Sequence, residues 1–423
     1  MSAKRAVILV VYILIFWTVL VIAKLLTYIF LMFQFSHIAA VLRRRKRRPR
    51  VLYLAAFFPG NAGYEERVRS WAQSLSEGRF DTKIRSCLDR RRFEDFLDRR
   101  PVVEFHLAFL IKRILHCLEA CRFDAVIVRR ELLLFNDYGG LFLERLLLAA
   151  NPRAALDFDD DISVAKQEPR PISTFGRLML ENGSKFRNSL KLYRRFIVGS
   201  SYLETMVRTG NATVGPADIA VVPTCIDPAQ YPLKRYREPG MDGCTAFGWI
   251  GSVGNLKYLD LVLPALEAIS REHPLKLIVI SGKAFKRDTS FEIVNVPWRY
   301  EIQGNSLSLL DIGLMPLDDG PEERGKCGFK LIQYMACGIV SIGSAVTTNI
   351  EIIEDGVNGF LVWKESEWEA AFREVLRQRD RFEEIGRNAR QTVAARYSFA
   401  AHQARYVEFV TRLSGVDGPG RQP

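Results

Sequence analysis

The sequence predicts an α/β protein with two Rossmann-like domains that face each other across a cleft, preceded by one N-terminal transmembrane helix. From Val51 onward, short apolar runs alternate with longer amphipathic stretches, the pattern of a parallel sheet covered by helices on both faces. The chain has 423 residues, more than the ~250 to 300 residues at which a single core stops growing. Apolar residues dominate from Ala6 to Phe35, which adds the membrane segment.

This N-terminal segment predicts a membrane anchor. Ala6 to Ala23 is interrupted only by a threonine, and about 20 apolar residues at ~1.5 Å each cross a hydrocarbon core of ~30 Å. A cleaved signal peptide is disfavoured, because its apolar part should span ~7 to 15 residues and end in small residues, whereas RRRKRRPR follows here. Lys24 leaves a monotopic hairpin or an interfacial helix as the alternative, since a charge near mid-membrane is costly.

Positive charge is concentrated in the same region. The net charge is +12, and ten Lys and Arg with no Asp or Glu lie in residues 1–50, which leaves +2 for the rest. A nearly neutral folded part without a basic and aromatic stripe predicts no nucleic-acid partner. Seven of the ten cations lie in Arg43 to Arg50, so the positive-inside rule predicts cytoplasmic domains held near anionic headgroups. Sugar on the glycosylation patterns at Asn182 or Asn211 would contradict this placement.

The seven cysteines follow no disulfide pattern and predict reduced thiols in a cytosolic domain. Cys117 and Cys121 lie four residues apart beside His116, but no fourth ligand follows at zinc-like spacing. Packing in the core is the better interpretation. We therefore expect no metal and no cofactor.

Two series of buried strands are predicted, with a proline- and glycine-rich linker between Pro228 and Cys244. The candidate strands are 51–58, 124–129, 154–159, 195–200 and 219–223, then 246–252, 275–282, 311–317, 339–343 and 359–362. Helical sequence runs from Glu365 to about Leu413, and the last ten residues are expected to be disordered. The predicted divisions are an anchor with its basic segment (1–50), a first domain (51–230), a second domain (245–395) and a C-terminal helix (396–413).

Glycine-bearing turns follow the first strand of each domain. PGNAGYEERV (59–68) contains Gly60 and Gly63, and GWIGSVGNLKYL (248–259) contains Gly251 and Ser252 ahead of Lys257. Small residues let backbone amides approach a ligand, and a helix N-terminus offers partial positive charge. The second turn therefore suits a diphosphate, although such turns are common in any doubly wound fold.

The stretch from Asp311 to Gly343 is the most informative. A strand leads into an acidic loop and then into a helix whose start carries glycines and lysines. The charged candidates in the loop and at the helix start are Asp318, Asp319, Glu322, Glu323, Lys326 and Lys330. Two lysines near a helix N-terminus can neutralise a nucleotide diphosphate leaving group, the charge that most needs stabilising when a glycosidic bond to phosphate breaks. Lysines in surface salt bridges are the alternative.

From Val51 to about Tyr397 the chain resembles the GT-B-fold glycosyltransferases of family 4, which are nucleotide-sugar-dependent retaining enzymes. The resemblance is carried by VVPTCIDPAQY (221–231), GWIGS (248–252), DIGLMPL (311–317), GKCGFKLIQYMACG (325–338) and EIIEDGVNGFLV (351–362). Each segment is modest, but their common order makes the combined signal specific.

The resemblance implies a role for each domain. The second would bind the nucleotide-sugar donor, and the first would bind the acceptor, with the C-terminal helix crossing back to it. The implied donor-binding residues are Gly251, Ser252, Lys257, Lys326, Gly328, Phe329, Lys330 and Gln333. No divalent metal is implied, because helix ends and lysines take that role.

The chain departs from the family at two positions. Many members carry two glutamates eight positions apart, where this chain has Gly325 and Gln333. Gln333 can still bond a ribose hydroxyl. The first glutamate is not obviously replaced, but the four carboxylates of residues 318–323 lie close enough in sequence to substitute.

Charged residues also end two strands of the first domain. Arg130 and Glu131 follow one strand, and Asp159 and Asp160 end the next, so their side chains should lie where parallel sheets bind ligands. Together with Gly60 and Gly63 they are the acceptor-side candidates. The DFDDD run also resembles the Asp-x-Asp of single-domain, metal-dependent transferases, against which the second Rossmann-like half argues.

These features predict a glycosyltransferase that acts with retention, with Lys326, Lys330, Glu322 and Glu323 as catalytic candidates. The anchor favours a lipid-linked or cell-surface glycan acceptor, with a purely structural tether as the alternative. A catalytically silent sugar-binding scaffold and a nucleotide-sugar epimerase of the same fold remain rival functions.

Overall fold

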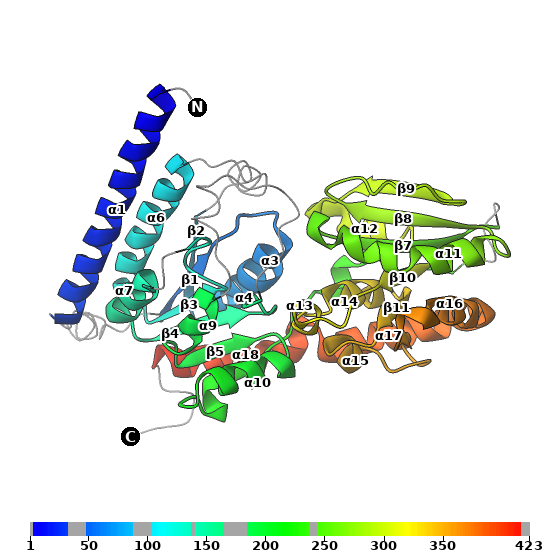
Figure 1. The fold of residues 1–423 in the computed structure, drawn as a ribbon. Helices are drawn as coiled ribbons and strands as arrows, with labels where there is room; N and C mark the ends of the chain where they lie inside the picture. Colours follow the sequence, from blue (N-terminus) through cyan, green and yellow to red (C-terminus); the bar gives the residue numbers. More distant parts are fainter. Residues whose placement is uncertain are drawn as a thin grey trace, which may run out of the picture. The chain divides into compact units, whose positions relative to one another are not determined.

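The computed structural model describes residues 3–32, 48–87, 103–136, 140–164, 184–236 and 243–415. The chain forms two compact units (Figure 1): unit 1 comprises the residues up to Val222 and those from Ala404, and unit 2 comprises Pro223–Gln403. Each unit contains a six-stranded sheet. The prediction of two Rossmann-like α/β domains is therefore confirmed.

The sheet of unit 1 is parallel throughout, in the order β2-β1-β3-β4-β5-β6. Its strands are β1 (Arg50–Ala55), β2 (Asp81–Ser86), β3 (Ala125–Arg129), β4 (Ala154–Phe158), β5 (Arg195–Val198) and β6 (Ile219–Val221). Central strands such as β3 and β4 are fully buried, because helices cover both faces of a parallel sheet. The strand order reverses between β1 and β3, and such a switch point is where open α/β sheets bind ligands.

Helices of unit 1 supply the covering layers. They are α1 (Ala3–Met32), α3 (Ala62–Tyr64), η1 (Glu65–Arg69), α4 (Ser70–Glu77), α6 (Val103–Glu119), η2 (Ala120–Arg122), α7 (Phe142–Ala150), α9 (Ser184–Leu190), α10 (Ser201–Gly210), η3 (Pro216–Asp218) and most of α18 (Phe399–Ser414). One apolar core joins sheet and helices and includes Leu20 and Ala23 of α1. The N-terminal helix is therefore an integral part of unit 1.

The sheet of unit 2 is also parallel, in the order β12-β11-β10-β7-β8-β9. Its strands are β7 (Thr245–Gly251), β8 (Leu275–Ser281), β9 (Glu292–Pro297), β10 (Ile312–Met315), β11 (Val340–Ser344) and β12 (Phe360–Val362). The switch point lies between β7 and β10. Two apolar clusters, one on each face, make up the core.

Helices of unit 2 range from short turns to a helix of 15 residues. They are η4 (Pro228–Gln230), η5 (Val253–Leu261), α11 (Leu263–Ser270), η6 (Tyr300–Ile302), α12 (Gln303–Leu307), α13 (Pro321–Arg324), α14 (Phe329–Ala336), α15 (Thr348–Ile352), η7 (Glu365–Glu367), α16 (Trp368–Arg377), η8 (Arg379–Arg381) and α17 (Phe382–Arg396). The expected helical sequence from Glu365 onward therefore forms α16, α17 and α18. The tail beyond Gly415 lies outside the described residues.

Two strands were missed by the sequence prediction, and both are edge strands. β2 (DTKIRS) pairs only with β1, and β9 (EIVNVP) pairs only with β8. Their side chains are largely half-buried or exposed. An edge strand buries less of its surface, so it lacks the continuous apolar run that marked the central strands.

The first connection between the units occurs earlier than the sequence suggested. Residues after Val222 belong to unit 2: the Ile226 amide donates to the Tyr397 carbonyl (3.0 Å), and the Phe399 amide donates to the Ile226 carbonyl (3.3 Å). The Lys234 amide donates to the Cys337 carbonyl (2.7 Å). Residues 223–236, which the sequence divided between first domain and linker, are thus held by backbone bonds within unit 2.

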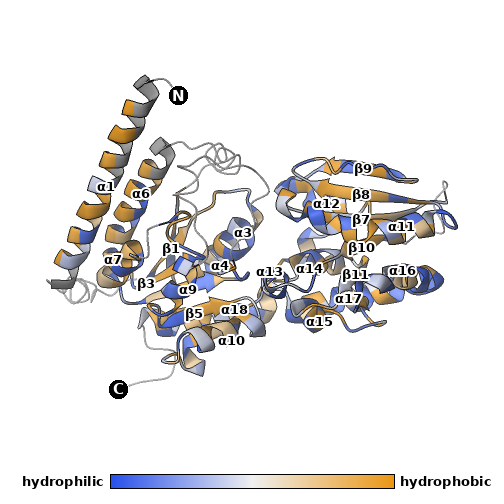
Figure 2. Cartoon of the chain, viewed as in Figure 1, coloured by the Kyte–Doolittle hydropathy of each residue, from blue (hydrophilic) through white to orange (hydrophobic). Residues whose placement is uncertain are grey.

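The N-terminal helix α1 is apolar along most of its length (Figure 2). Its side chains are described at positions 7, 10, 11, 14, 15 and 17–29. Within the described part of the chain, no helix meets the requirements of length and apolar character for crossing a membrane. The transmembrane helix expected over residues 6–23 is therefore not supported, and most of the basic run after it lies outside the described residues.

Candidate functional site

The switch point of unit 2 brings Gly251 and Lys330 together. A Cβ on Gly251 would lie 2.8 Å from Lys330 Cε and 2.5 Å from the ring of Trp249, so only glycine lets the lysine stem pass over the end of β7. The Lys330 ammonium lies 5.4 Å from the centroid of the Trp249 ring, within the range of a cation–π contact. Because Trp249 is 1% exposed, it forms a rigid floor beneath this cation.

Two further lysines lie against Tyr258 of η5. Lys257 Nζ is 4.8 Å and Lys326 Nζ is 5.4 Å from the centroid of its ring. The Tyr258 hydroxyl donates to the buried carboxylate of Glu323, and burial, followed by this bond, raises the pKa of Tyr258 above its usual value. Tyr258 therefore remains a neutral donor that positions η5 against α13.

Lys326 is also paired with an acidic neighbour. Its Nζ lies 3.4 Å from Glu322 Oε1, and the side chains are 16% and 27% exposed. The Lys326 amide donates to the Glu323 carbonyl at 3.1 Å. Among the charged candidates of this loop, the structure thus brings Lys326, Glu322 and Glu323 together around the end of α13.

The start of α14 depends on glycine. Gly328 adopts φ +67°, and a Cβ there would overlap Ile352, so a side chain would be strained in two ways. Phe329 begins the helix and packs against the core. The N-terminus of α14, with its partial positive charge, thus starts three residues beyond Lys326 and one before Lys330.

Gln333 lies in a buried amide network. It is 4% exposed, and its Nε2 donates to Gln303 Oε1 at 3.0 Å and lies 3.5 Å from the Tyr231 hydroxyl. Gln303 donates to the same hydroxyl at 3.3 Å. Gln333 therefore links α14, α12 and the segment after η4, and a contact with a ribose remains a prediction.

The remaining acidic residues of the loop face solvent. Asp319 forms a two-pronged ion pair with Arg324, at 2.7 and 3.0 Å, and this bond lowers the pKa of its carboxyl. Asp318 is exposed. Glu322 and Glu323 are consequently the carboxylates of this loop that lie beside a lysine or a buried tyrosine.

Sequence reasoning missed residues on the neighbouring strand ends of unit 2. Thr347 has φ +27°, a strained conformation for a residue other than glycine. Thr348 beside it is 5% exposed, and its hydroxyl has no hydrogen-bond partner within the described structure. A Cβ on Gly328 would lie 3.5 Å from Thr348, so this loop adjoins the start of α14. The only sequence signal was a pair of threonines after a buried strand.

In unit 1, the corresponding turn follows β1. Gly60 has φ +89°, and its amide donates to Glu65 Oε1 at 2.7 Å. The chain then forms one turn of α3 and the π-helix η1, an irregularity that often accompanies functional sites. A Cβ on Gly63 would lie 3.7 Å from Arg129 Nη2, so the turn approaches the end of β3.

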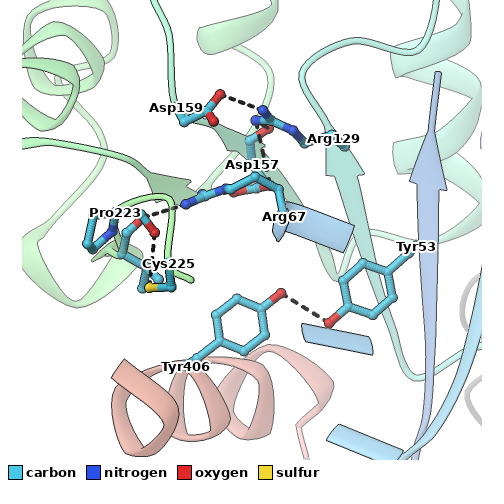
Figure 3. Close-up of polar contacts among 9 residues, drawn as sticks. Tyr53, Arg67, Arg129, Asp157, Asp159, Pro223, Cys225 and Tyr406 are labelled. Carbon is cyan, nitrogen blue, oxygen red and sulfur yellow. Dashed lines mark hydrogen bonds and ion pairs between the residues drawn. The ribbon is translucent and has the colours of Figure 1, made fainter. Parts of the chain in front are cut away.

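A buried network of charges occupies the switch point of unit 1 (Figure 3). Arg129 pairs with Asp159 and lies 3.8 Å from Asp157, and Arg67 pairs with Asp157. Arg67 also donates to the Val222 carbonyl at 2.6 Å. Each of the four side chains is no more than 7% exposed. A buried charge network of this kind requires every partner, since loss of one leaves an uncompensated charge.

The other acceptor-side candidates lie around this network. Arg130 has φ +64° and is half-buried, as is Asp160. Glu131 pairs with the buried Lys185 at 3.2 Å, whose ammonium also donates to the Phe135 carbonyl at 3.0 Å. The structure thus brings Gly63 and Asp159 together through Arg129, while Glu131 belongs to a second ion pair.

Arg67 and Arg129 were not identified from the sequence. VIVRR contains two adjacent arginines, and the alternation of a strand does not say which one points into the switch point. Arg67 lies in the charged segment EERVR, where the sequence does not mark it as buried. Only the folded chain shows that both arginines meet Asp157.

Two further sequence candidates have structural roles. Cys117 is fully buried, and the His116 ring lies 3.9 Å from Cys87; burial lowers the pKa of His116 to about 4. Asn211 is 7% exposed, and its side-chain amide donates to the carbonyls of Leu190 (2.8 Å) and Tyr193 (3.0 Å). Asn211 therefore closes a turn, and Asn182 lies outside the described residues.

Comparison with known proteins assigns a chemistry to unit 2. Residues 245–378 match the family described as glycosyl transferases group 1, a range that contains Gly251, Tyr258, Lys326 and Lys330. No curated protein matches the sequence.

Solved structures share the fold over most of the chain. Sucrose-phosphate synthase from Thermosynechococcus elongatus has a TM-score of 0.63 at 12% identity, covering 88% of this chain and 100% of that one. Anabaena Alr3699/HepE in complex with UDP and glucose has a TM-score of 0.59 at 15% identity, covering 86% and 100%. The lipopolysaccharide outer core galactosyltransferase WaaB has a TM-score of 0.55 at 12% identity, covering 86% and 99%. The fold is therefore GT-B.

The group 1 domain and this fold together define the class of the protein. It is a glycosyltransferase with the GT-B fold.

Proposed function

We propose that this protein is a retaining glycosyltransferase of family 4 that transfers a sugar from a nucleoside diphosphate sugar, bound by unit 2, to a lipid-linked or cell-surface glycan acceptor. The observation that carries the donor part is the group of three lysines at the β7–β10 switch point. Lys257 and Lys326 lie on Tyr258, and Lys330 lies on Trp249 beside Gly251. Cations on rigid aromatic rings are preorganised for a diphosphate.

In the proposed reaction the leaving diphosphate accepts the acceptor proton, and catalysis depends mainly on stabilising its negative charge. The bond between the anomeric carbon and the diphosphate oxygen breaks, the acceptor oxygen bonds to the anomeric carbon on the same face, and the acceptor proton moves to the leaving phosphate. Lys326, Lys330 and the amides at the start of α14 would stabilise the negative charge that develops on the diphosphate. Glu322 and Glu323 would orient the lysines and the donor sugar. No metal is assigned, because these cations already supply the positive charge.

Support for a membrane-associated acceptor comes from the N-terminal region. α1 exposes many large apolar side chains, and the basic run of residues 43–50 follows it. Attraction of this basic run to the anionic cytoplasmic leaflet favours a cytoplasmic location for both units. WaaB, which shares the fold, is a galactosyltransferase of the lipopolysaccharide outer core, so a protein of this fold acts on a glycolipid.

Donor titration tests this proposal. UDP, GDP, ADP and their glucose and N-acetylglucosamine derivatives are screened by thermal shift, and the best ligand is followed for slow hydrolysis by NMR. Binding with release of the α-anomer from an α-linked donor supports retention. Release of the β-anomer refutes retention, conversion of the sugar while it remains nucleotide-linked indicates an epimerase, and failure of every nucleotide to bind refutes the donor site.

A further inference from the structure

The apolar N-terminal helix is docked on the body of unit 1. Its later half contacts α6 and α7, with Leu20, Ala23 and Thr27 buried. Leu20 and Ala23 share one core cluster with Phe109, Leu110 and Ile114 of α6. A helix that is part of a domain core cannot act as a free tether, so its outward face has a fixed orientation relative to unit 1.

That outward face is mostly apolar along its described length. In the first half Val7, Val10, Leu14 and Trp17 are 44 to 62% exposed, and in the docked half Val21, Ile22, Leu25, Tyr28 and Ile29 are 42 to 65% exposed. On α6, Ile111 and Leu115 are 42% and 58% exposed and lie one turn apart. In Figure 2, most of the coloured part of α1 and several turns of α6 carry the colour of apolar residues. Exposed apolar surface of this extent marks an interaction site.

Cationic residues on and after the same helices indicate which kind of partner binds this apolar face. Lys24 of α1 and Lys112 of α6 are exposed among the apolar side chains, and seven Lys and Arg follow in residues 43–50. Long cationic side chains beside apolar surface suit a boundary where acyl chains meet anionic headgroups. A soluble protein partner would require no such basic run.

Topology sets the direction of this surface. α6 ends just before β3 begins, so its start lies at the carboxyl ends of the strands, which is the side that carries Gly60, Arg129 and Asp159. In Figure 1, α1 runs in the same direction as α6 and extends beyond its start. The undocked half of α1 therefore projects on the side of the candidate acceptor residues.

We propose that α1 and α6 form one lipid-facing ridge, which inserts into a single leaflet of an anionic bilayer and directs the switch point of unit 1 toward the lipid surface. The residues that define the ridge are Trp17, Ile22 and Leu25 of α1 and Ile111 and Leu115 of α6. The inference rests on the proposed membrane-held acceptor and specifies how unit 1 would reach it. The glycan of a lipid-linked acceptor would then reach unit 1 while its lipid tail stays in the bilayer.

Photolabelling of the full chain tests the ridge. The protein is bound to phosphatidylcholine and phosphatidylglycerol vesicles that contain a lipid with a diazirine in its acyl chain, irradiated, digested and mapped by mass spectrometry. We expect adducts on peptides of α1 and on the α6 peptide with Ile111 and Leu115. The double variant Ile111→Glu, Leu115→Glu should lose the α6 adducts and partition onto vesicles at least ~10-fold more weakly. The matched control is Leu309→Glu, since Leu309 is 50% exposed in unit 2.

The possible results separate the inference from the proposed function. Adducts on α1 without adducts on α6 overturn the ridge and leave an anchor by α1 alone. Absence of adducts from the whole chain overturns both the ridge and the membrane-held acceptor. Nucleotide binding by the same samples is measured in parallel. Failure of the wild-type protein to bind any nucleotide would count against the donor site, independently of the ridge. The wild-type map needs no variant, so misfolding of the double variant cannot obscure the result.

Discussion

Lys326 offers the sharpest test of the donor site. The structure shows its ammonium group paired with the carboxylate of Glu322, which would compete with a donor phosphate for the same cation. Replacing Lys326 by methionine retains most of its packing on Tyr258 but removes the charge. A hydrogen bond to a charged group contributes ~1.5 to 3 kcal/mol. Because Lys326 must exchange the carboxylate of Glu322, 3.4 Å away, for a phosphate, we expect a net loss near the lower end, ~1 to 2 kcal/mol, or about 5- to 30-fold in Kd.

The same geometry predicts an effect of opposite sign at Glu322. Glu322→Gln removes the competitor for Lys326 and a negative charge near the diphosphate, so the affinity should rise about 2- to 5-fold. If Glu322 also contacts the donor sugar, the turnover of this variant falls while its nucleotide affinity still rises. Combining the two substitutions should abolish the gain, since the pair is then removed as a unit.

Isothermal titration with the nucleoside diphosphate that binds best measures both effects, at two salt concentrations to separate charge from packing. The matched control is Arg324→Met, which removes an exposed cation of the same loop that is paired with Asp319, and it should change Kd less than twofold. The reasoning is refuted if Lys326→Met binds as well as wild type, or if Glu322→Gln binds more weakly.

Three further predictions follow from other parts of the structure. Gly251→Ala should displace Lys330 and weaken nucleotide binding ~10-fold or more, whereas Gly254→Ala, which meets no atom within 4 Å, should not; equal titration curves for both would count against the close approach at Gly251. Arg129→Met should lower the free energy of unfolding by ~3 to 5 kcal/mol, because it removes a buried cation that lies against the carboxylates of Asp157 and Asp159, and urea denaturation with an unchanged midpoint would contradict this. Burial lowers the pKa of His116 to about 4. Between pH ~6.5 and 4, the unfolded chain therefore carries a proton on His116 that the folded chain does not. The free energy of unfolding consequently falls as the pH is lowered from ~6.5 to 4. His116→Gln should reduce this fall by ~1 to 2 kcal/mol, about half of the full linkage value because the ring is partly solvated; parallel pH profiles would disprove the assignment.

The predicted central strands were found because burial on both faces makes them continuous apolar runs. The edge strands β2 and β9 escaped notice, since half-exposed strands such as DTKIRS carry no such signal. The transmembrane prediction rested on apolar length alone. Apolar length does not show which side chains pack within the protein. In the structure, Leu20 and Ala23 are buried in a core cluster that includes residues of α6.

By itself, the sequence determined the class of fold, the two glycine turns and the lysine-bearing loop of unit 2, because these depend on local periodicity and on the order of motifs along the chain. Only the tertiary structure decided which side chains share a site. Lys330 meets Gly251, and Arg67 meets Asp157, across 79 and 90 positions of the sequence. Such pairs arise from the order in which parallel strands assemble, since that order places distant strand ends side by side, and no local pattern records it.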